Sequence, residues 1–323
     1  MRAILPVGDT RQPVPRIGDL PDPVPGPGEV LIAVEAAGLN HADVHQLRGT
    51  YPPPPGESDV PGLECAGRVL QSTDNLWQPG ARVMALVGGG AHATLAAIPS
   101  GQLLPLPGNL SYAEGAAIPE AALTAWTNLV AEGGLEAGET VLISGATGGM
   151  GSFAVQLARE LGARVIASGR DHDRLEQLRT YGVEEICVAG PNLAQQVRDA
   201  TNGRGVDLVL DFVGGSELPG HVAALRERGR LVLIGLLAGT RAEVNLGLVL
   251  GRRLKIVGSL LRPRSRPEKA RLVSDFNAFA LPRFKDGRLR PVIDRTIPFE
   301  RAAEAYRLLE HGGVLGKIVL EMA

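Results

Sequence analysis

A glycine-rich turn near the middle of the chain has the composition of a phosphate-binding loop. Residues 144–151 read Ser-Gly-Ala-Thr-Gly-Gly-Met-Gly. Glycine lets the backbone approach a pyrophosphate closely, and a helix that begins at such a turn points its N–H groups at the anion. The turn therefore predicts dinucleotide binding, whereas a simple tight turn is the alternative that the glycines alone leave open. The predicted phosphate-contacting residues are Gly145, Gly148, Gly149, Met150 and Gly151.

The residues that end the next β-branched run bear on the choice of nucleotide. A fold that prefers NAD usually has Asp or Glu about 20 residues past the glycines, where the carboxylate binds the ribose 2′-hydroxyl. Here Ser168 and Gly169 occupy that place, and Arg170 and Arg174 follow within one turn. Guanidinium groups suit a 2′-phosphate, so the segment predicts NADPH in preference to NADH. The alternative is that both arginines are solvated and pair with neighbouring aspartates.

Residues that could hold a metal ion are sparse. Cys65 and Cys187 lie far apart and form no Cys-x-x-Cys or Cys/His spacing, so we expect neither a disulfide framework nor a structural zinc site. His41 and His45 have metal-ligand spacing on a helix, but no glutamate stands in the zincin position and no third ligand is near. We interpret them as ordinary histidines, and we expect no bound metal and a reducing, cytoplasmic compartment.

The elements that would position these residues follow a repeating pattern. From Thr140 onward, short β-branched runs alternate with helix-period segments, which is typical of a parallel sheet with crossover helices. The clearest helix covers residues 151–159, with Gly162 as a stop. We therefore expect a doubly wound α/β sheet. Its predicted strands are Val141–Ser144, Arg164–Ser168, Glu185–Val188, Asp207–Asp211, Arg230–Gly235 and Lys255–Leu260.

Proline divides the 323-residue chain into regions of different character. Of 24 prolines, 17 lie in residues 1–119, two in 120–262 and five in 263–323. Because proline interrupts helices and central strands, we expect a nucleotide-binding domain over 120–262 and a second domain built from 1–119 and 263–323. A hydrophobic content of 44% with 21% charged residues is enough for a core in each.

Charge and hydropathy argue against two classes of protein. A formal net charge of -2 is unlike that of most nucleic-acid-binding proteins. The longest stretch without Asp, Glu, Lys or Arg, residues 83–113, contains three consecutive glycines and three prolines, so it predicts short strands and turns and no membrane span. The first residues lack the apolar run and cleavage site of a signal peptide.

Several longer segments together resemble one known family. They are Ala36–Asp43, Arg48–Gly56, Pro61–Gly67, Ala117–Ala125, the Gly145 turn, Gly258–Arg262 and Gly316–Glu321. On these residues the chain resembles the zinc-independent quinone oxidoreductase branch of the medium-chain dehydrogenase/reductase superfamily, most closely the tumour-suppressor-inducible quinone oxidoreductases. The resemblance implies a GroES-like, β-rich substrate domain that the C-terminal residues complete, and a Rossmann domain that binds NADPH.

The resemblance also identifies the positions at which alcohol-oxidising relatives hold zinc. Asn40 stands where those enzymes have cysteine, and Gly62-Leu63-Glu64 stands where they have Gly-His-Glu. The lobe with four closely spaced cysteines is missing. Without thiolate and imidazole ligands no Lewis acid is available to deprotonate an alcohol, so we expect hydride transfer without zinc.

Tyr51 and Asn40 are the predicted catalytic residues. Tyr51, one of only four tyrosines, lies in the proline-rich loop 49–56, and a phenol can stack on a quinone or hydrogen-bond its oxygen. The resemblance places both residues beside the nicotinamide. The alternatives are that Tyr51 only packs in a turn and that Asn40 only caps one.

Further cofactor contacts are expected by position. The resemblance implies that Thr124 lies near the nicotinamide, although a helix-interior threonine is the alternative. Arg262 is a further candidate, and Ala189, where many relatives have a tyrosine near the 2′-phosphate, weakens the NADPH prediction without reversing it. Residues that follow the fourth and fifth strands lie at carboxyl ends, where doubly wound sheets bind ligands. The remaining predicted contacts are Phe212, Val213, Gly235, Leu236, Leu237, Ser259, Leu261 and Lys317.

A basic segment near the end of the nucleotide-binding region bears on partners. Residues 252–271 contain eight Lys and Arg against the single acid Glu268, a density that could indicate nucleic-acid binding. No aromatic residues are interleaved for base stacking, so a solvated edge is the favoured interpretation. The strand Lys255–Leu260 is expected at the sheet edge, where exposed backbone can pair with a second subunit, and we predict a homodimer, as the resemblance also implies.

Residues and resemblance together predict an NADPH-dependent quinone oxidoreductase that transfers hydride to a small-molecule quinone. Reduction of α,β-unsaturated ketones or aldehydes is the alternative within the same class. A non-catalytic, crystallin-like protein that binds NADPH or RNA is the alternative from another class.

Overall fold

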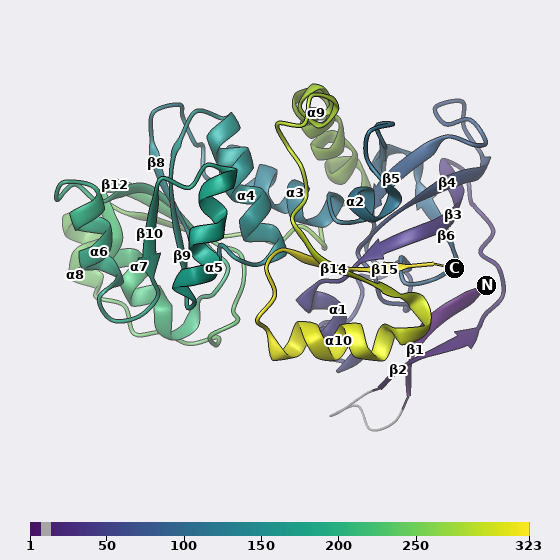
Figure 1. Ribbon diagram of the computed structural model, residues 1–323, viewed down its shortest axis with the longest axis horizontal. Helices are drawn as coiled ribbons and strands as arrows, with labels where there is room; N and C mark the ends of the chain where they lie inside the picture. The colour runs from purple at the N-terminus through teal and green to yellow at the C-terminus, as the bar shows by residue number, and fades with distance from the viewer. Residues whose placement is uncertain (8–13, 323) are drawn as a thin grey trace. The chain divides into compact units, whose positions relative to one another are not determined.

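The computed structural model describes residues 1–7 and 14–322 (Figure 1). Their contacts form two compact units, one of Met1–Leu123 with Leu261–Ala323 and one of Thr124–Leu260. Both ends of the described chain thus contribute to the first unit, whereas the second is one continuous segment. Helix α3 (Pro119–Trp126) and the π-helical segment Thr127–Glu132 lie where the chain passes from the first unit to the second. None of the described helices is both long and apolar enough to cross a membrane.

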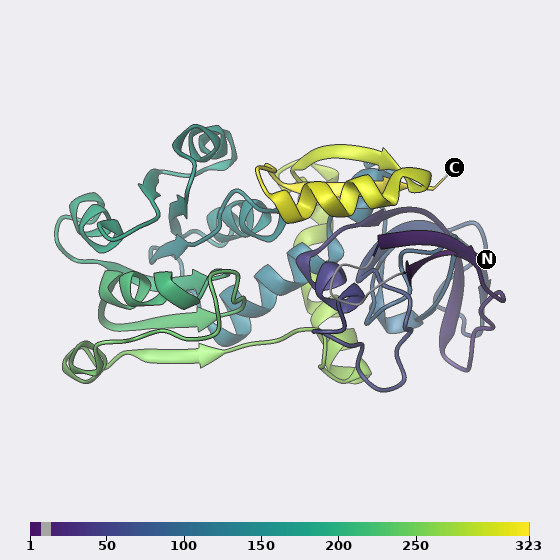
Figure 2. The same ribbon diagram turned by 90° about the horizontal axis from the view of Figure 1, so that it is seen from below.

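The Thr124–Leu260 unit contains a parallel six-stranded sheet. Its strand order is β10-β9-β8-β11-β12-β13, so the sheet begins in the middle and grows outward in both directions. The unit is the teal to light-green part of the chain in Figures 1 and 2. This order is that of a doubly wound sheet, which confirms the predicted fold class for this part of the chain. The strands are β8 (Thr140–Ile143), β9 (Arg164–Gly169), β10 (Glu185–Val188), β11 (Val206–Asp211), β12 (Leu225–Leu233) and β13 (Lys255–Gly258).

Crossover helices connect these parallel strands. Helices α6 and α7 pack against each other, and an apolar cluster that includes Leu193, Val197 and Val222 buries their inner faces on the sheet. Helix α4 contacts β8 and β9 and buries Phe153 and Leu157. The helices are α4 (Gly149–Glu160), α5 (His172–Gln177), α6 (Leu193–Ala200), α7 (Leu218–Ala224) and α8 (Leu246–Gly251), with short 3-10 turns at Leu178–Tyr181 and Gly215–Glu217.

Strand β12 differs from its predicted extent. It begins at Leu225, before the predicted Arg230, and ends at Leu233. Leu225 pairs with Val206, and a register shift separates this pair from the regular ladder that starts at Leu208 and Arg230. The charged sequence Arg-Glu-Arg that follows Leu225 conceals the strand start, because it interrupts the apolar run.

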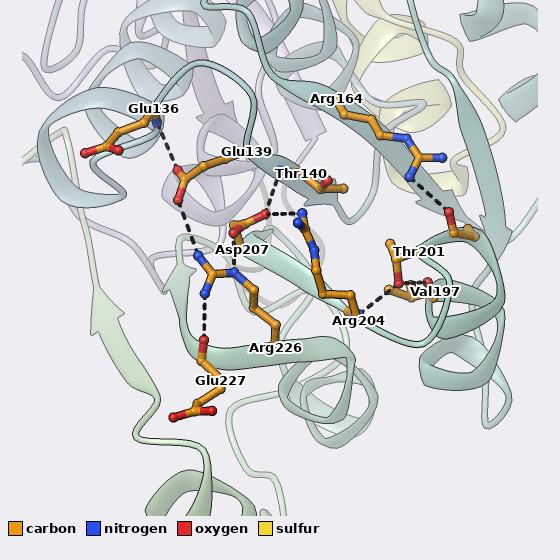
Figure 3. A network of polar contacts seen from close by, with 12 residues as sticks. Glu136, Glu139, Thr140, Arg164, Val197, Thr201, Arg204, Asp207, Arg226 and Glu227 are labelled. Atoms are coloured by element: carbon orange, nitrogen blue, oxygen red, sulfur yellow. Dashed lines mark hydrogen bonds and ion pairs between the residues drawn. The ribbon is translucent and has the colours of Figure 1, made fainter.

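An ionic network lies at the amino-terminal edge of this sheet (Figure 3). The buried Asp207 carboxylate accepts a hydrogen bond from the backbone N–H of Thr140 at 2.8 Å, and it forms an ion pair with the Arg226 guanidinium. Arg226 also lies 4.0 Å from the Glu139 carboxylate, and Arg204 lies 3.4 Å from Asp207. All strands of a parallel sheet run in the same direction, so this network lies at the edge opposite their carboxyl ends. We therefore assign the network a role in stabilising the fold.

The first unit is built around a seven-stranded sheet and a two-stranded sheet. The larger sheet has the order β14-β15-β3-β4-β5-β7, and β6 also pairs with β3; the smaller one is β1-β2. The strands are β1 (Arg2–Val7), β2 (Val14–Asp19), β3 (Glu29–Gly38), β4 (Glu64–Ser72), β5 (Arg82–Leu86), β6 (Leu95–Pro99), β7 (Leu103–Pro105), β14 (Ile293–Pro298) and β15 (Lys317–Glu321).

Helices of the first unit pack against these strands. Helix α10 packs against β2, β15 and α1, and an apolar cluster with Phe299 and Tyr306 fills the space between them. The helices are α1 (His41–Leu47), α2 (Tyr112–Ala116), α9 (Arg266–Lys285) and α10 (Ala302–His311), with 3-10 turns at Ser100–Gln102 and Phe299–Arg301.

The C-terminal strand is an integral part of the first unit's sheet. β15 pairs antiparallel with β3, so that Val319 lies opposite Gly38 and Glu321 opposite Ala36. β15 also pairs in parallel with β14. This register brings Lys317, the first residue of β15, next to the end of β3 and the start of α1.

Candidate active site

The glycine-rich turn joins β8 to α4. Gly145 has a φ of 60°, in the left-handed region that favours glycine. A Cβ at Gly151 would lie 2.5 Å from the carbonyl oxygen of Gly145, so only glycine permits this close packing of helix against turn. Gly148 is the N-cap of α4, and Gly149 and Met150 are its first helical residues. The turn thus places a helix N-terminus, with N–H groups that lack intrahelical acceptors, at the carboxyl end of β8.

Two buried serines lie at the carboxyl ends of parallel strands in this sheet. Ser168 is near the end of β9, and Ser259 directly follows β13. Both side chains are buried, and within the described part of the chain neither Oγ has a hydrogen-bond partner. An unpaired buried hydroxyl costs about 1–3 kcal/mol, so each would gain from a polar ligand. The donor set along this edge therefore fits a dinucleotide.

The two arginines after β9 have different surroundings. Asp171 is the N-cap of α5, where its Oδ1 accepts the backbone N–H of Arg174 at 3.1 Å, and its Oδ2 lies 3.4 Å from the Arg174 guanidinium. Arg170 is exposed, and among residues 1–7 and 14–322 no side chain or carbonyl pairs with it. Gly169 and Ala189 are joined by a backbone hydrogen bond of 2.8 Å. The pairing alternative thus describes Arg174 and not Arg170.

The turn after β11 is held by a buried carboxylate. Asp211 Oδ1 accepts the backbone N–H of Val213 at 2.9 Å and that of Gly214 at 2.8 Å, and its Oδ2 lies 2.9 Å from His221 Nδ1. Burial opposes ionisation, but these hydrogen bonds and His221 together lower the Asp211 pKa. Phe212 is buried in the same turn. The carboxylate therefore fixes the predicted contact residues Phe212 and Val213.

The other predicted cofactor residues lie in less specific surroundings. Leu236 and Leu237, which follow β12 and Gly235, expose 48% and 58% of their surface. Thr124 is buried inside α3, and its carbonyl accepts a hydrogen bond from Asn128 Nδ2 at 2.7 Å. Leu261 is buried in the first unit. These positions stay predictions for cofactor contact.

A buried ionic cluster in the first unit contains the predicted residues Asn40 and Lys317. Lys317 Nζ donates to Asn40 Oδ1 at 2.7 Å and to the carbonyl of Leu39 at 2.7 Å, and it lies 2.5 Å from Glu64 Oε1. Asn40 Nδ2 donates to the same Glu64 oxygen at 3.0 Å. Lys317 is 4% exposed and Glu64 is fully buried. Asn40 does occupy the N-cap of α1, but its side chain is directed into this cluster.

Glu120 adjoins the cluster through its backbone. Its N–H donates to the second oxygen of Glu64 at 2.9 Å. Burial, followed by the neighbouring Glu64 carboxylate, raises the Glu120 pKa to about 7, although the Lys317 charge opposes the shift. A carboxyl group that titrates near neutral pH is unusual, and such groups concentrate at functional sites.

Tyr51 lies under a buried guanidinium. The Arg262 guanidinium carbon is 5.0 Å from the centre of the Tyr51 ring, and Arg262 donates to the Tyr51 carbonyl at 3.1 Å. Its other bonds go to the carbonyl of Gly88 at 2.8 Å and to the side chain of Gln46 on α1. Burial raises the Tyr51 pKa, although Arg262 opposes the shift. The half-buried phenol therefore stays protonated at neutral pH.

His41 and His45 both lie on α1, where a spacing of four residues places two side chains on the same face of the helix. Both are exposed, and His45 Nδ1 lies 3.2 Å from the hydroxyl of Thr50. Asp43, on the opposite face, is buried and accepts the backbone N–H of Gly62 at 3.0 Å. The helix therefore turns its histidines and its carboxylate in different directions.

Sequence reasoning missed Glu64 and Glu120 as members of the site. In the sequence, Glu64 stands out only as a residue of the altered zinc motif. Glu120 is only one residue of a segment that resembles the family. A signal for Glu64 was available, because a charged residue at the start of a buried strand usually has a buried partner. No comparable signal marks Glu120.

Two family models match the chain in the regions of these two units. "Alcohol dehydrogenase GroES-like domain" matches residues 26–108 and "Zinc-binding dehydrogenase" matches residues 149–276. Among solved structures, the quinone oxidoreductase of Thermus thermophilus, described with its NADPH complex, is 34% identical, covers 99% of this chain and 100% of its own, and has a TM-score of 0.84. The chain belongs to the medium-chain dehydrogenase/reductase superfamily. The predicted pairing of a GroES-like domain with a Rossmann domain is confirmed.

Other members of the superfamily carry different names. A solved NAD-dependent alcohol dehydrogenase is 31% identical, covers all of both chains and has a TM-score of 0.87. A phenolphthiocerol/phthiocerol polyketide synthase protein of Mycobacterium tuberculosis is 32% identical over 300 residues, which are 91% of this chain but 14% of that protein. The chain thus spans about one seventh of the length of this curated relative. The superfamily binds a nicotinamide cofactor, and the glycine-rich turn and unpaired serines fit such a ligand.

The zinc in the family description does not fit the residues present. Among the described residues, no group of three or more His, Cys, Asp and Glu side chains could hold a metal ion. The polar oxygens of Asn40 and Glu64 instead face the Lys317 ammonium. The Lys317 ammonium of the chain itself therefore supplies the positive charge beside these oxygens.

Proposed function

We propose that the protein is an NADPH-dependent oxidoreductase that reduces quinones by hydride transfer without a metal ion. One observation carries the proposal: the charge that balances Glu64 beside Asn40 is the Lys317 ammonium. Without a Lewis acid to activate an alcohol, the favoured substrate accepts hydride without prior activation. A quinone does so, because its reduced product is aromatic. The 34% identity to a quinone oxidoreductase supports the same substrate class, and the segments named above favour the tumour-suppressor-inducible branch.

Preference for NADPH over NADH rests on the residues after β9. No carboxylate stands at Ser168 or Gly169, and Arg170 is exposed without a protein partner among the described residues. A 2′-phosphate would thus meet a guanidinium group and no like charge. The NADPH complex of the Thermus thermophilus relative is consistent with this choice.

The side chains of the first unit would orient the acceptor. The reduced nicotinamide, when bound, supplies the hydride. Asn40 would donate an N–H to the acceptor oxygen on which negative charge develops, since preorganised donors are most valuable there. The Tyr51 phenol, kept protonated by burial, would stack on the acceptor or donate to its oxygen. The two residues thus hold and polarise the acceptor, while no strong acid is needed.

Reduction of α,β-unsaturated carbonyl compounds is the second candidate. We keep this candidate because the chain is also similar to part of a polyketide synthase, a protein whose name does not point to quinones. Such a substrate also takes hydride at carbon but needs a proton at the adjacent carbon. Glu120, whose pKa is about 7, is a group in this region that could hold one.

Steady-state NADPH oxidation distinguishes these functions. We expect turnover of 1,4-benzoquinone and 9,10-phenanthrenequinone, and weaker turnover of an enone series. Tyr51→Phe should lower kcat/KM for the quinones roughly tenfold, the equivalent of one hydrogen bond, while the matched variant Tyr181→Phe should not change it. Faster turnover of enones than of quinones would favour the second candidate. Tight NADPH binding without turnover of either series would contradict both and favour a non-catalytic protein.

A further inference from the structure

Lys317 uses its whole hydrogen-bonding capacity inside the protein. An ammonium group has three N–H donors, and the Lys317 group has three acceptors, namely the Leu39 carbonyl, Asn40 Oδ1 and Glu64 Oε1, within 2.5–2.7 Å. The side chain is 4% exposed. No donor is left for a cofactor phosphate, so this geometry favours a different role from the cofactor contact that the sequence predicts.

The charges around Asn40 allow one orientation of its amide. Its oxygen faces an ammonium, which can only donate, and its nitrogen faces the Glu64 carboxylate, which when ionised can only accept. Rotation of the amide by half a turn would set N–H against ammonium and C=O against carboxylate. Both new contacts would be repulsive and would lie in a buried environment, where such contacts are costly.

The two charged residues are themselves held firmly. The second oxygen of Glu64 accepts the Glu120 backbone N–H at 2.9 Å. A Cβ at Gly38 would lie 2.5 Å from Glu64 Oε1, so the glycine at the end of β3 is what admits the carboxylate. The pairing of β15 with β3 fixes Lys317 from the other side. The pair is therefore a rigid support for Asn40.

We infer that Lys317 and Glu64 are positioning residues that lock the Asn40 amide so that it offers substrate an N–H donor and no acceptor. This inference rests on the proposed function and adds the substrate chemistry of its site. The second Nδ2 hydrogen of Asn40 has no acceptor among the described residues. A quinone or ketone oxygen can accept it, and the donor then stabilises the negative charge that develops on that oxygen during hydride transfer. The site thereby suits a substrate whose reacting group accepts a hydrogen bond.

A double-mutant cycle with Lys317→Met and Asn40→Ala tests this role. Each single variant should lower kcat for 1,4-benzoquinone roughly tenfold, and the double variant should lose little more, because Lys317 acts through Asn40. The NADPH Kd, from nicotinamide fluorescence, should stay within about twofold of wild type. Additive losses in kcat, or a tenfold weaker NADPH Kd with unchanged kcat, would overturn the inference and assign Lys317 to the cofactor.

Stability needs its own control, because Lys317→Met leaves Glu64 buried without a counter-charge. The double variant Glu64→Gln/Lys317→Met removes both charges, and it should fold while still losing the fixed amide orientation. Lys285→Met, at an exposed lysine, is the matched control and should resemble wild type in every assay. If Glu64→Gln/Lys317→Met folds and keeps wild-type kcat, the inference is wrong.

An NMR measurement separates this inference from the proposed function. The side-chain amide signals of Asn40, assigned by their loss in Asn40→Asp, should be two distinct protons with slow solvent exchange in wild type. Glu64→Gln/Lys317→Met should move both signals toward the shifts of a free asparagine side chain and speed their solvent exchange. Unchanged signals would overturn the positioning role even in an active enzyme. Absence of turnover in wild type, with the expected NMR change, would instead contradict only the proposed function.

Discussion

Single residues of the buried cluster carry charges whose balance depends on pH. Glu64 is neutralised by the Lys317 ammonium, whereas burial and the Glu64 charge disfavour the ionised form of Glu120 and raise its pKa to about 7. An ordinary glutamate has a pKa of 4.5, so it is already ionised well below neutral pH. Between these two values the folded protein binds a proton that the unfolded chain has released.

Glu120→Gln should therefore change how stability depends on pH. In wild type, the contribution of Glu120 to folding is most favourable below pH 4.5 and declines as the pH rises to about 7. Glutamine removes this decline, so at pH 8 the variant should have a higher free energy of unfolding by on the order of 2 kcal/mol, and the gain should be smaller at pH 5. Urea unfolding at both pH values measures the difference. The matched variant Glu136→Gln, at an exposed site, should show none, and an equal effect of Glu120→Gln at both pH values would refute the shift.

Replacement of the two arginines after β9 should have unequal effects. Arg170→Ala should raise the NADPH KM roughly tenfold, because a charge-assisted hydrogen bond contributes about 1.5–3 kcal/mol. Arg174→Ala should have a smaller effect, since Arg174 already pairs with Asp171. The NADH KM should stay the same in both variants. Parallel changes for NADPH and NADH would show that neither arginine contacts the 2′-phosphate.

Residue types indicate parts of the site but not their partners. Asn40, Tyr51 and Lys317 are predicted from the sequence, because each stands in a segment that resembles the family. The role of Glu64 is not, since its partner Lys317 is distant in sequence and meets it only through the β15–β3 register. Pairings of this kind depend on tertiary structure, which periodicity and spacing do not specify.

At the scale of elements, Arg262 connects three segments of the first unit. It donates to Gln46 on α1, to the Gly88 carbonyl after β5 and to the carbonyl of Tyr51. Arg262 is 5% exposed, and its guanidinium also stacks on the Tyr51 ring. The proline-rich loop is therefore held by an external clamp as well as by its own stiffness.

Arg262→Met should loosen the Tyr51 loop. Loss of three hydrogen bonds and of the stacked cation should lower the free energy of unfolding by about 3 kcal/mol. The variant should also raise the KM for 1,4-benzoquinone more than the KM for NADPH, because the clamp acts on the acceptor-binding residue. Thermal unfolding and steady-state kinetics measure both effects. Arg271→Met, on the exposed face of α9, is the matched control, and equal behaviour of the two variants would exclude the clamp.

The parallel sheet is the set of elements that the sequence predicts best. Strands such as β10 and β11 are short apolar runs bounded by turns, and their ends lie within one residue of prediction. The predicted start of β12 is too late in the sequence, because its first residues are charged and pair beyond a bulge. Local pattern locates regular buried strands, whereas irregular pairing has no local signature.

At the scale of the whole molecule, the sheet of the second unit ends in an exposed strand. β13 is the last strand in the sheet order, and Ile256 and Leu260 expose 44% and 56% of their surface. On the preceding helix α8, Leu246 and Leu250 are more exposed still. Unpaired edges with apolar side chains are surfaces that proteins usually cover, which supports the predicted homodimer.

Ile256→Glu should therefore weaken self-association. Light scattering after size exclusion should give a dimer for wild type and a monomer, or a mixture that depends on concentration, for the variant, because a buried unpaired carboxylate is costly. Leu76→Glu, at an exposed leucine of the other unit, is the matched control and should stay dimeric. A monomeric wild type would contradict the dimer directly.

The pairing of β15 with β3 also sets the order in which the protein can be made. Asn40 and Lys317 are 277 residues apart, so the ribosome releases the amide long before the ammonium that orients it. Until residue 317 emerges, Glu64 lacks its Lys317 counter-charge, and the end of β3 at residues 36–38 lacks its partner strand β15. Synthesis at about 5–20 residues per second leaves the incomplete sheet waiting for on the order of 10–60 s. Completion of this centre therefore comes long after Asn40 is made, and the nascent chain is most open to chaperones and proteases during that interval.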